Sequence, residues 1–398
     1  MFKNERTYLD VAAGVSANAS SPHAEGREAK AMLENARTTI ARLVECKSDD
    51  IVFTSGATDA NALAILGRVR AARAGGLEHS HVLYLPSAHA SVVENMKLVE
   101  NESADIEALP IKNCRVDCDA LAKLLRPETV LVSMDAVCGE TGVIWNTREV
   151  ACTLEKSGHP MSLGHRMSTF RPVLHVDASQ ATWTQKLTRA HFGADLMTLD
   201  ASKVCETRGI GCLVVSRTTA LAPLYGGGGQ ERGLRPGSEA SDLAAAFAEG
   251  LSRAAEGRAH FCAEASAARA ELVKAIRAGV PDVLINESSG GFVSPHVGTY
   301  ETPASQAPHI LNLSLTRYDT DYIVALLDEA GFAVSTRSAC ETDSKTGSRS
   351  VFALWGDATR AVSTLRISWG PTVGTRALAQ FPQALIQAVR FIDSAGVT

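Results

Sequence analysis

Short apolar runs alternate with segments of helical spacing through the first half of the chain. The apolar runs are residues 51–53, 81–85, 130–134, 173–177, 196–199 and 211–215. Apolar side chains recur at the intervals of one helix face in residues 28–43, 59–71 and 87–99. Nearly continuous apolar strands separated by helices are typical of a mostly parallel sheet covered by helices on both faces. We therefore predict an α/β fold whose chemistry lies at the carboxyl ends of the strands.

The second half of the chain has a different pattern. Residues 241–277 are rich in Ala with helical periodicity, which predicts one long helix linking two domains. Further expected elements are half-exposed strands at 310–315, 332–335 and 365–368 and helices at 320–330 and 375–395. These elements predict a smaller α+β domain formed by residues 1–11 and 251–398, beside a large domain formed by residues 12–250.

Two segments lie outside this alternation. Residues 287–308 are rich in Ser, Gly and Pro and predict an exposed loop. The residues around His165 have the character of an insertion before the strand at 173–177.

Composition narrows the class of protein. The 398 residues are 45% apolar and 21% charged, which is typical of a globular protein. A net charge of −5 argues against a general nucleic-acid binder. The chain has no apolar run of about 18 residues, so no membrane span is expected. Its start lacks the apolar stretch of a secretory signal, and we predict a cytoplasmic location.

Nine cysteines are scattered along the chain without a disulfide framework, which is typical of a reducing compartment. The closest pair, Cys114 and Cys118, has no further ligands at short spacing, so no metal site is predicted there.

Three polar positions mark candidate chemistry beside predicted strands. Lys203 follows the strand at 196–199, where a buried lysine can form a Schiff base with an aldehyde cofactor; a solvated surface lysine is the alternative. Asp177 can pair with a protonated pyridine nitrogen or cap a helix. Residues 54–58 can bind a phosphate at a helix N-terminus or only cap that helix.

A series of short motifs runs along most of the chain. The motifs are residues 8–13, 18–29, 53–61, 88–92, 139–143, 175–180, 209–211, 227–238 and 337–340. In this order they resemble the class V aminotransferase family and, within it, the cysteine desulfurases of the iron–sulfur cluster type. The resemblance implies the fold-type I pyridoxal-phosphate transferase architecture and a homodimer.

The resemblance also implies an activity. It is the conversion of L-cysteine to L-alanine with pyridoxal 5′-phosphate, which leaves a persulfide on Cys340 for iron–sulfur cluster or thio-modification supply. A sulfur-acceptor or scaffold protein is the implied partner. Cys340 lies in a polar loop segment of the small domain, where Arg337 and Lys345 would favour the reactive thiolate.

Individual residues take roles from the resemblance. Four match contacts of the cofactor ring: the Schiff-base lysine Lys203, the pyridine partner Asp177, the ring-hydroxyl contact Gln180, and His89, which stacks on the ring and can move protons. Three match contacts of the phosphate: Ala57, Thr58 and, from the other subunit, Ser238; Ser202, beside the Schiff-base lysine, is a further expected cofactor contact. Three are placed near the substrate: Arg366, which would hold its carboxylate, with Asn312 and Asn61.

The chain departs from the family inside this site. Ser202 stands where the family has a histidine, and Asp200 stands where a Ser or Thr usually binds phosphate. Cys138 and Gly139 replace paired asparagines. A carboxylate beside a phosphate would repel it, so we expect Asp200 to point away or to be compensated.

Two other interpretations remain open. A selenocysteine lyase, or another class V enzyme acting on a different amino acid, would share the cofactor site without depending on Cys340. A non-catalytic scaffold of a sulfur-transfer system is favoured by the substitutions just described. Purified protein that absorbs at roughly 400 nm would support a cofactor enzyme over the scaffold.

Overall fold

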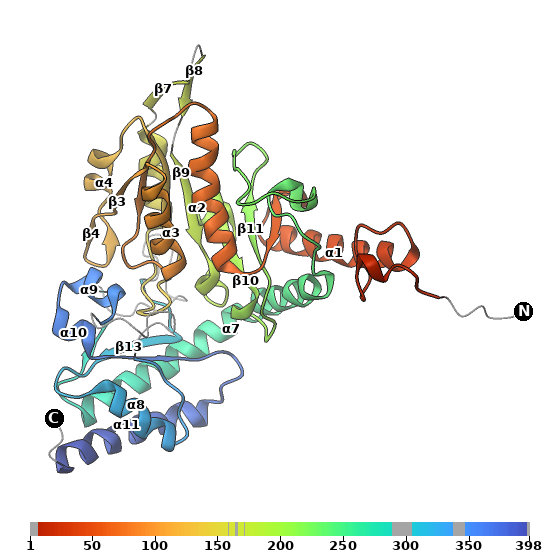
Figure 1. Ribbon diagram of the computed structural model, residues 1–398. Helices are drawn as coiled ribbons and strands as arrows, with labels where there is room; N and C mark the ends of the chain where they lie inside the picture. The colour runs from red at the N-terminus through yellow and green to blue at the C-terminus, as the bar shows by residue number, and fades with distance from the viewer. Residues whose placement is uncertain are drawn as a thin grey trace, which may run out of the picture.

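The computed structural model describes residues 7–157, 159–163, 166–170, 172–288, 305–336 and 347–395. Its largest element is a seven-stranded sheet (Figure 1). In spatial order the strands are β1 (Ile51–Thr54), β11 (Gly211–Val215), β10 (Leu196–Asp200), β9 (Val173–Asp177), β6 (Thr129–Asp135), β2 (His81–Tyr84) and β3 (Asp105–Ala108). Only β11 is antiparallel to its neighbours, so the other six strands end at the same edge.

Helices cover this sheet because most of its strands are apolar on both faces. Every residue of β1, β6, β9 and β11 is buried. Helix α2 (Ala57–Ala74) packs across β6, β10 and β11, with α3 (Ala90–Asn101) beside it (Figure 1). Helix α1 (Ala24–Leu43) packs along α7 (Ser241–Gly279). The mostly parallel α/β fold predicted from the sequence is confirmed.

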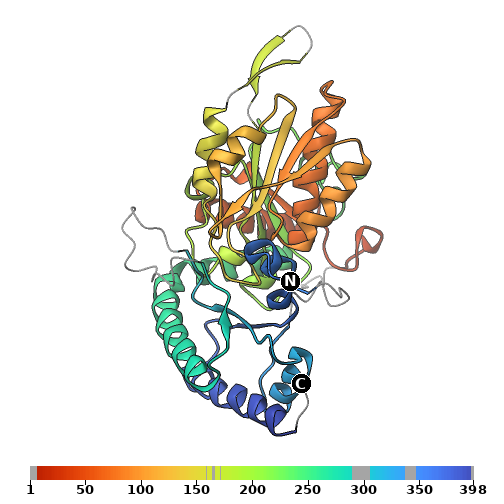
Figure 2. The same ribbon diagram turned by 90° about the vertical axis from the view of Figure 1, so that its left-hand side faces the viewer.

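A three-stranded antiparallel sheet forms the centre of a second core. Its order is β12 (Leu284–Ile285), β13 (Ile310–Ser314) and β14 (Thr364–Ser368). Helices α8 (Thr320–Glu329) and α11 (Thr375–Ala395) contribute to the same core, and α7 and α11 form an arc around the sheet (Figure 2).

Helix α7 connects the two cores. Its Phe247 and Leu251 are buried in the larger core, whereas Phe261 and Leu272 are buried in the smaller one. The long linking helix is therefore present as expected. The predicted domain boundary after residue 250 falls within this helix, and the domain limits remain a prediction.

Three local expectations need correction. Residues 332–335 do not form a strand, because only Ser335 lies opposite β14, in a single bridge to Arg366. Strand β13 is fully buried rather than half-exposed, since it is the central strand of its sheet. The segment 287–308 is not exposed where it is described near its end, because Gln306 is buried and donates to the Thr141 carbonyl (2.5 Å); residues 289–304 lie outside the described residues.

The pattern also left several short elements unpredicted. They are α4 (Cys118–Leu124), α5 (Thr147–Lys156), α6 (Arg189–Phe192), α9 (Arg349–Trp355), α10 (Ala358–Val362), β4 (Ile111–Lys112), β5 (Arg115–Val116), β7 (His159–Leu163) and β8 (Arg166–Phe170). Strands β7 and β8 form a hairpin at the predicted insertion and project beyond the large sheet (Figure 1). Among the described helices, none has the length and apolar character needed to cross a membrane.

Candidate active site at the edge of the large sheet

Three carboxylates end neighbouring strands at the shared carboxyl edge. Asp135 ends β6, Asp177 ends β9 and Asp200 ends β10. Asp135 lies directly opposite Asp177 in the parallel register, and Asp177 lies opposite Thr198 of β10. The predicted ring partner Asp177 therefore stands between two strands that also end in acidic residues.

Asp177 is buried and held by two donors. One carboxylate oxygen, Oδ2, accepts from Asn61 Nδ2 (2.7 Å), and Oδ1 accepts from the Ser179 amide (3.0 Å). Asn61 is fully buried in α2, and its amide group also donates to Ser91 Oγ (2.8 Å). Asn61 thus holds the Asp177 carboxylate from helix α2.

The same series of hydrogen bonds reaches His89. The Ser91 hydroxyl and His89 Nδ1 are 2.8 Å apart, and the Ser91 amide donates to Nδ1 (3.2 Å). Because the Ser91 amide donates to Nδ1, this nitrogen is an acceptor, and the Ser91 hydroxyl donates to it as well. A neutral His89 therefore carries its proton on Nε2. His89 is exposed and caps α3, so the structure joins it to Asp177 through Ser91 and Asn61.

The carboxyl of Asp135 was not singled out by the sequence. It is 4% exposed, and burial, followed by the negative charge of Asp177, raises its pKa well above the ordinary value. The neutral acid is therefore the favoured form beside Asp177. Its one sequence signal is an acidic residue directly after the apolar run at 130–134.

Unpartnered polar atoms surround Asp177. Oδ1 of Asn61, Oδ1 of Asp135 and Oγ of Ser179 are buried with no hydrogen-bond partner among the described residues. Such atoms are rare in folded proteins and suit a polar ligand. A carboxylate held by two donors is also the anion that a protonated pyridine nitrogen requires. These residues fit the ring end of pyridoxal phosphate.

The phosphate end is arranged differently from the expectation. Helix α2 begins at Ala57, whose amide donates to Asp200 Oδ2 (2.8 Å). Asp200 Oδ1 accepts from both the amide (2.8 Å) and the hydroxyl (2.6 Å) of Ser202. Asp200 does not point away, and Ser202 contacts it instead of an open site. Thr58 is exposed in the first turn of α2.

Lys203 lies on the turn directly after β10, as predicted, but its side chain is exposed rather than buried. Its carbonyl accepts from Trp183 Nε1 (2.9 Å), which fixes the backbone of this turn. The amine is therefore accessible in a single chain.

Gln180 packs against the backbone of Gly139. A Cβ placed on Gly139 would come 2.9 Å from Gln180 Nε2, so no larger residue fits at 139 without moving the glutamine. At the position where the family has an asparagine, the Gln180 side chain therefore lies close to the Gly139 backbone.

The smaller sheet reaches the same loop. Arg366 on β14 donates to the Gly139 carbonyl (3.4 Å), and Asn312 on β13 donates to the Glu140 carbonyl (3.2 Å). Asn312 is fully buried, and its Oδ1 accepts from Asn286 (2.5 Å). The structure therefore brings Arg366 to the site but gives the Asn312 amide a structural contact.

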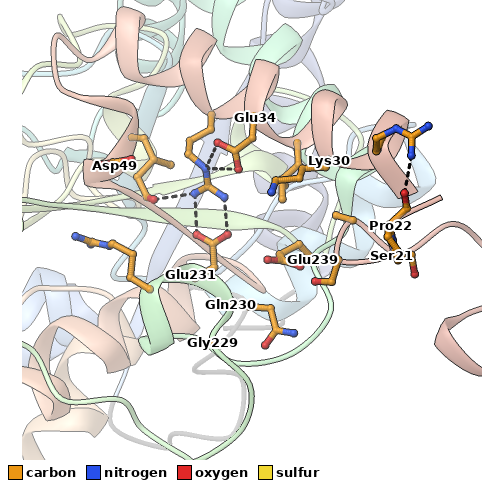
Figure 3. A pocket seen from close by; sticks show the side chains of 16 residues that line it. Ser21, Pro22, Lys30, Glu34, Asp49, Gly229, Gln230, Glu231 and Glu239 are labelled. Atoms are coloured by element: carbon orange, nitrogen blue, oxygen red, sulfur yellow. Dashed lines mark hydrogen bonds and ion pairs between the residues drawn. The ribbon is translucent and has the colours of Figure 1, made fainter. Parts of the chain in front are cut away.

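Ser238 ends a segment that a buried ion pair anchors. It is exposed and accepts from Asn18 (3.3 Å). Upstream, Glu231 receives two hydrogen bonds from Arg37 (2.6 and 2.8 Å) and one from the Phe53 amide (2.8 Å). Figure 3 shows Glu231 in a pocket between α1 and the segment 229–232, which none of the predicted site residues lines. Glu231 lies within the motif at 227–238, but no motif includes its partner Arg37, so the sequence did not indicate this ion pair.

Cys340 lies outside the described residues, so its position is not part of this geometry. The eight cysteines that are described are all free thiols. Burial, the largest influence on both, raises the pKa of Cys46 and of Cys262 to about 11, which disfavours their thiolates at neutral pH.

Residues 5–256 match the family model described as aminotransferase class-V. The chain is 31% identical over 355 residues to a protein of Archaeoglobus fulgidus named cysteine desulfurase IscS 1, covering 89% of this chain and 84% of that protein. A solved structure described as a NifS-like protein has the same fold, with a TM-score of 0.80, 23% identity and coverage of 94% and 92%. Another, described as SspA in complex with cysteine, has a TM-score of 0.70, 25% identity and coverage of 89% and 91%.

Proposed function

The chain belongs to the aminotransferase class-V family, and we propose that it is a pyridoxal-phosphate-dependent cysteine desulfurase. It converts L-cysteine to L-alanine and keeps the sulfur as a persulfide on Cys340 for transfer to an acceptor. The observation that carries the proposal is the hydrogen-bonded series from His89 to Asp177 at the sheet edge, on the strand next to the one that leads to Lys203.

The residues at the ring end of the site have separate roles. When bound, pyridoxal phosphate supplies an electron sink for charge that develops on the substrate. Asp177 would pair its carboxylate with the ring nitrogen, and Asn61 and Ser179 hold that carboxylate. Lys203 would hold the cofactor through its amine and would then move the substrate α-proton. His89 presents its Nε2 proton to the site, since Nδ1 is already used by Ser91.

The substrate end uses Arg366 and Cys340. The Arg366 guanidinium pairs with the substrate carboxylate. The Cys340 thiolate forms an S–S bond to the substrate sulfur while the C–S bond of the substrate breaks. The carbon takes up a proton and leaves as L-alanine. The high thiol pKa of Cys46 and Cys262 supports assigning this step to another cysteine.

The proposal includes a homodimer. A second copy would cover Lys203 and Thr58, which are exposed in one chain, and would bring its own Ser238 to the phosphate end. We also propose a sulfur-acceptor or scaffold protein as partner. The proposed small domain consists of residues 1–11 and 251–398. The proposed location is cytoplasmic.

The test is incubation of the purified protein with L-cysteine, with alanine and protein-bound persulfide measured together. We expect one alanine per persulfide in a single turnover of the parent and no persulfide in Cys340→Ser. Lys203→Ala is the matched control, because it should lose both products.

Two results would redirect the assignment. Alanine formation that survives Cys340→Ser would favour another class V enzyme. Protein that stays colourless with added pyridoxal 5′-phosphate and yields no alanine would favour the scaffold.

A further inference from the structure

The Asp200 carboxylate accepts hydrogen bonds only from uncharged donors, at the start of α2 and in its own turn. Its three hydrogen bonds come from the Ala57 amide and from the amide and hydroxyl of Ser202. Arg235 pairs with Asp59 in the first turn of α2 (3.3 Å). Among the residues that the structure describes, no Lys or Arg forms an ion pair with Asp200, so uncharged donors hold its carboxylate.

A phosphate ester at this place would need the same donor. Amides at a helix N-terminus bind phosphate because they have no partner within the helix. Asp200 already occupies the first of these amides, at Ala57. A phosphate monoester also carries about −1.5 to −2 charges near neutral pH, so the carboxylate would repel it as well as compete for the donor.

The ring end is independent of this contact. Asp177 is held by Asn61 and Ser179, neither of which bonds to Asp200. Affinity for the ring and affinity for the phosphate can therefore change separately.

We propose that Asp200 is a specificity-determining residue that weakens the contribution of the phosphate group to cofactor binding, so that the site accepts the unphosphorylated vitamer nearly as well as the phosphorylated one. This inference rests on the proposed function and concerns the cofactor end of the same site.

The test measures non-covalent binding, apart from activity. The probes are 4′-deoxypyridoxine and its 5′-phosphate, which lack the aldehyde and cannot react with Lys203; calorimetry on the full chain gives both dissociation constants. Asp200→Asn removes the charge but keeps an acceptor for Ala57, and Asp200→Ser removes the carboxylate. Asp119→Asn is the control, because Asp119 is exposed in the first turn of α4 and gives the same change in net charge.

We expect the parent and Asp119→Asn to bind the two probes with dissociation constants within roughly tenfold of each other. Asp200→Asn should bind the phosphate probe at least about tenfold more tightly than the parent does, because a nearby like charge has been removed. Its affinity for the unphosphorylated probe should change little. Asp200→Ser should change in the same direction, and inorganic phosphate should raise its melting temperature more than the parent's.

Strong preference of the parent for the phosphate form, unchanged in both Asp200 variants, would overturn the inference while leaving desulfurase activity intact. If no form binds either probe and the parent makes no alanine from L-cysteine, both the proposed function and this inference are wrong.

Discussion

Asp177 and Asp200 end adjacent parallel strands, but their surroundings differ. Asp177 is 7% exposed and is held by a side chain from within α2, with unpartnered polar atoms beside it. Asp200 is partly exposed and its contacts are with the start of α2 and its own turn. One carboxylate is therefore prepared for a ligand, whereas the other already has the partners that a ligand would use. Burial and the origin of the donors, rather than residue type, separate the two roles.

The largest effect that would test this comparison is expected from Asp177→Asn. The amide has nearly the same shape but cannot supply a negative charge to the ring nitrogen. We expect the turnover of L-cysteine to fall by about 100-fold or more, the size of loss seen when one electrostatic stabiliser is removed. Single-turnover alanine formation measures it. Asp200→Asn is the comparison and should keep most of the activity at saturating cofactor. Equal losses of activity in the two variants would show that the ring end and the phosphate end of the site do not differ in this way.

Asn61→Leu tests the support of Asp177. The leucine is similar in size but removes one of the two donors to the Asp177 carboxylate and the donor to the Ser91 hydroxyl. We expect the free energy of unfolding to fall by about 1–3 kcal/mol, the cost of leaving buried polar groups unsatisfied. Urea unfolding of the cofactor-free protein measures it, and an unchanged midpoint would contradict the role given to Asn61.

Asp135→Asn should stabilise the protein in a pH-dependent way. The folded pKa of Asp135 lies above its unfolded value, so ionisation on unfolding lowers stability as pH rises from about 4 towards the folded pKa. Asparagine removes this loss while still accepting a hydrogen bond. We expect the melting temperature of Asp135→Asn to exceed that of the parent at pH 7 and to approach it at pH 4, because the loss caused by ionisation is present only at the higher pH. Melting temperatures across this range decide; a gain that grows as pH falls would contradict the reasoning.

Ser202→Ala should have the smallest effect. The hydroxyl contact with Asp200 is lost, but the amide contact remains and the residue is exposed. We expect the unfolding free energy to change by no more than about 0.5 kcal/mol, as is usual at exposed positions. A loss as large as that of Asn61→Leu would show that the phosphate end is as tightly built as the ring end.

The sequence predicted the elements that carry regular apolar patterns. Six of the seven strands of the large sheet and the helix 375–395 follow such patterns closely, whereas the more exposed edge strand β3 was not predicted. The isolated bridge at Ser335 shows the limit, because an alternating pattern does not state whether a neighbouring strand lies alongside.

The sequence predicted only those residues of the candidate site that match motifs or single positions of the family. Lys203, Asp177 and His89 are such matches. Asp135 and Arg37 could not be found in this way, since their importance depends on residues 42 and 194 positions away along the chain. The direction of the Asp200 side chain likewise depends on Ala57, 143 positions earlier.

The continuous course of α7 has a consequence for how the protein melts. Its 39 residues include no proline, and its two halves are stabilised by packing in different cores. If one core opened, half of the helix would lose the packing that sustains it, since helices of this kind are marginal alone in water. The two cores should therefore lose structure together on heating, in one cooperative transition in which calorimetric and van't Hoff enthalpies agree.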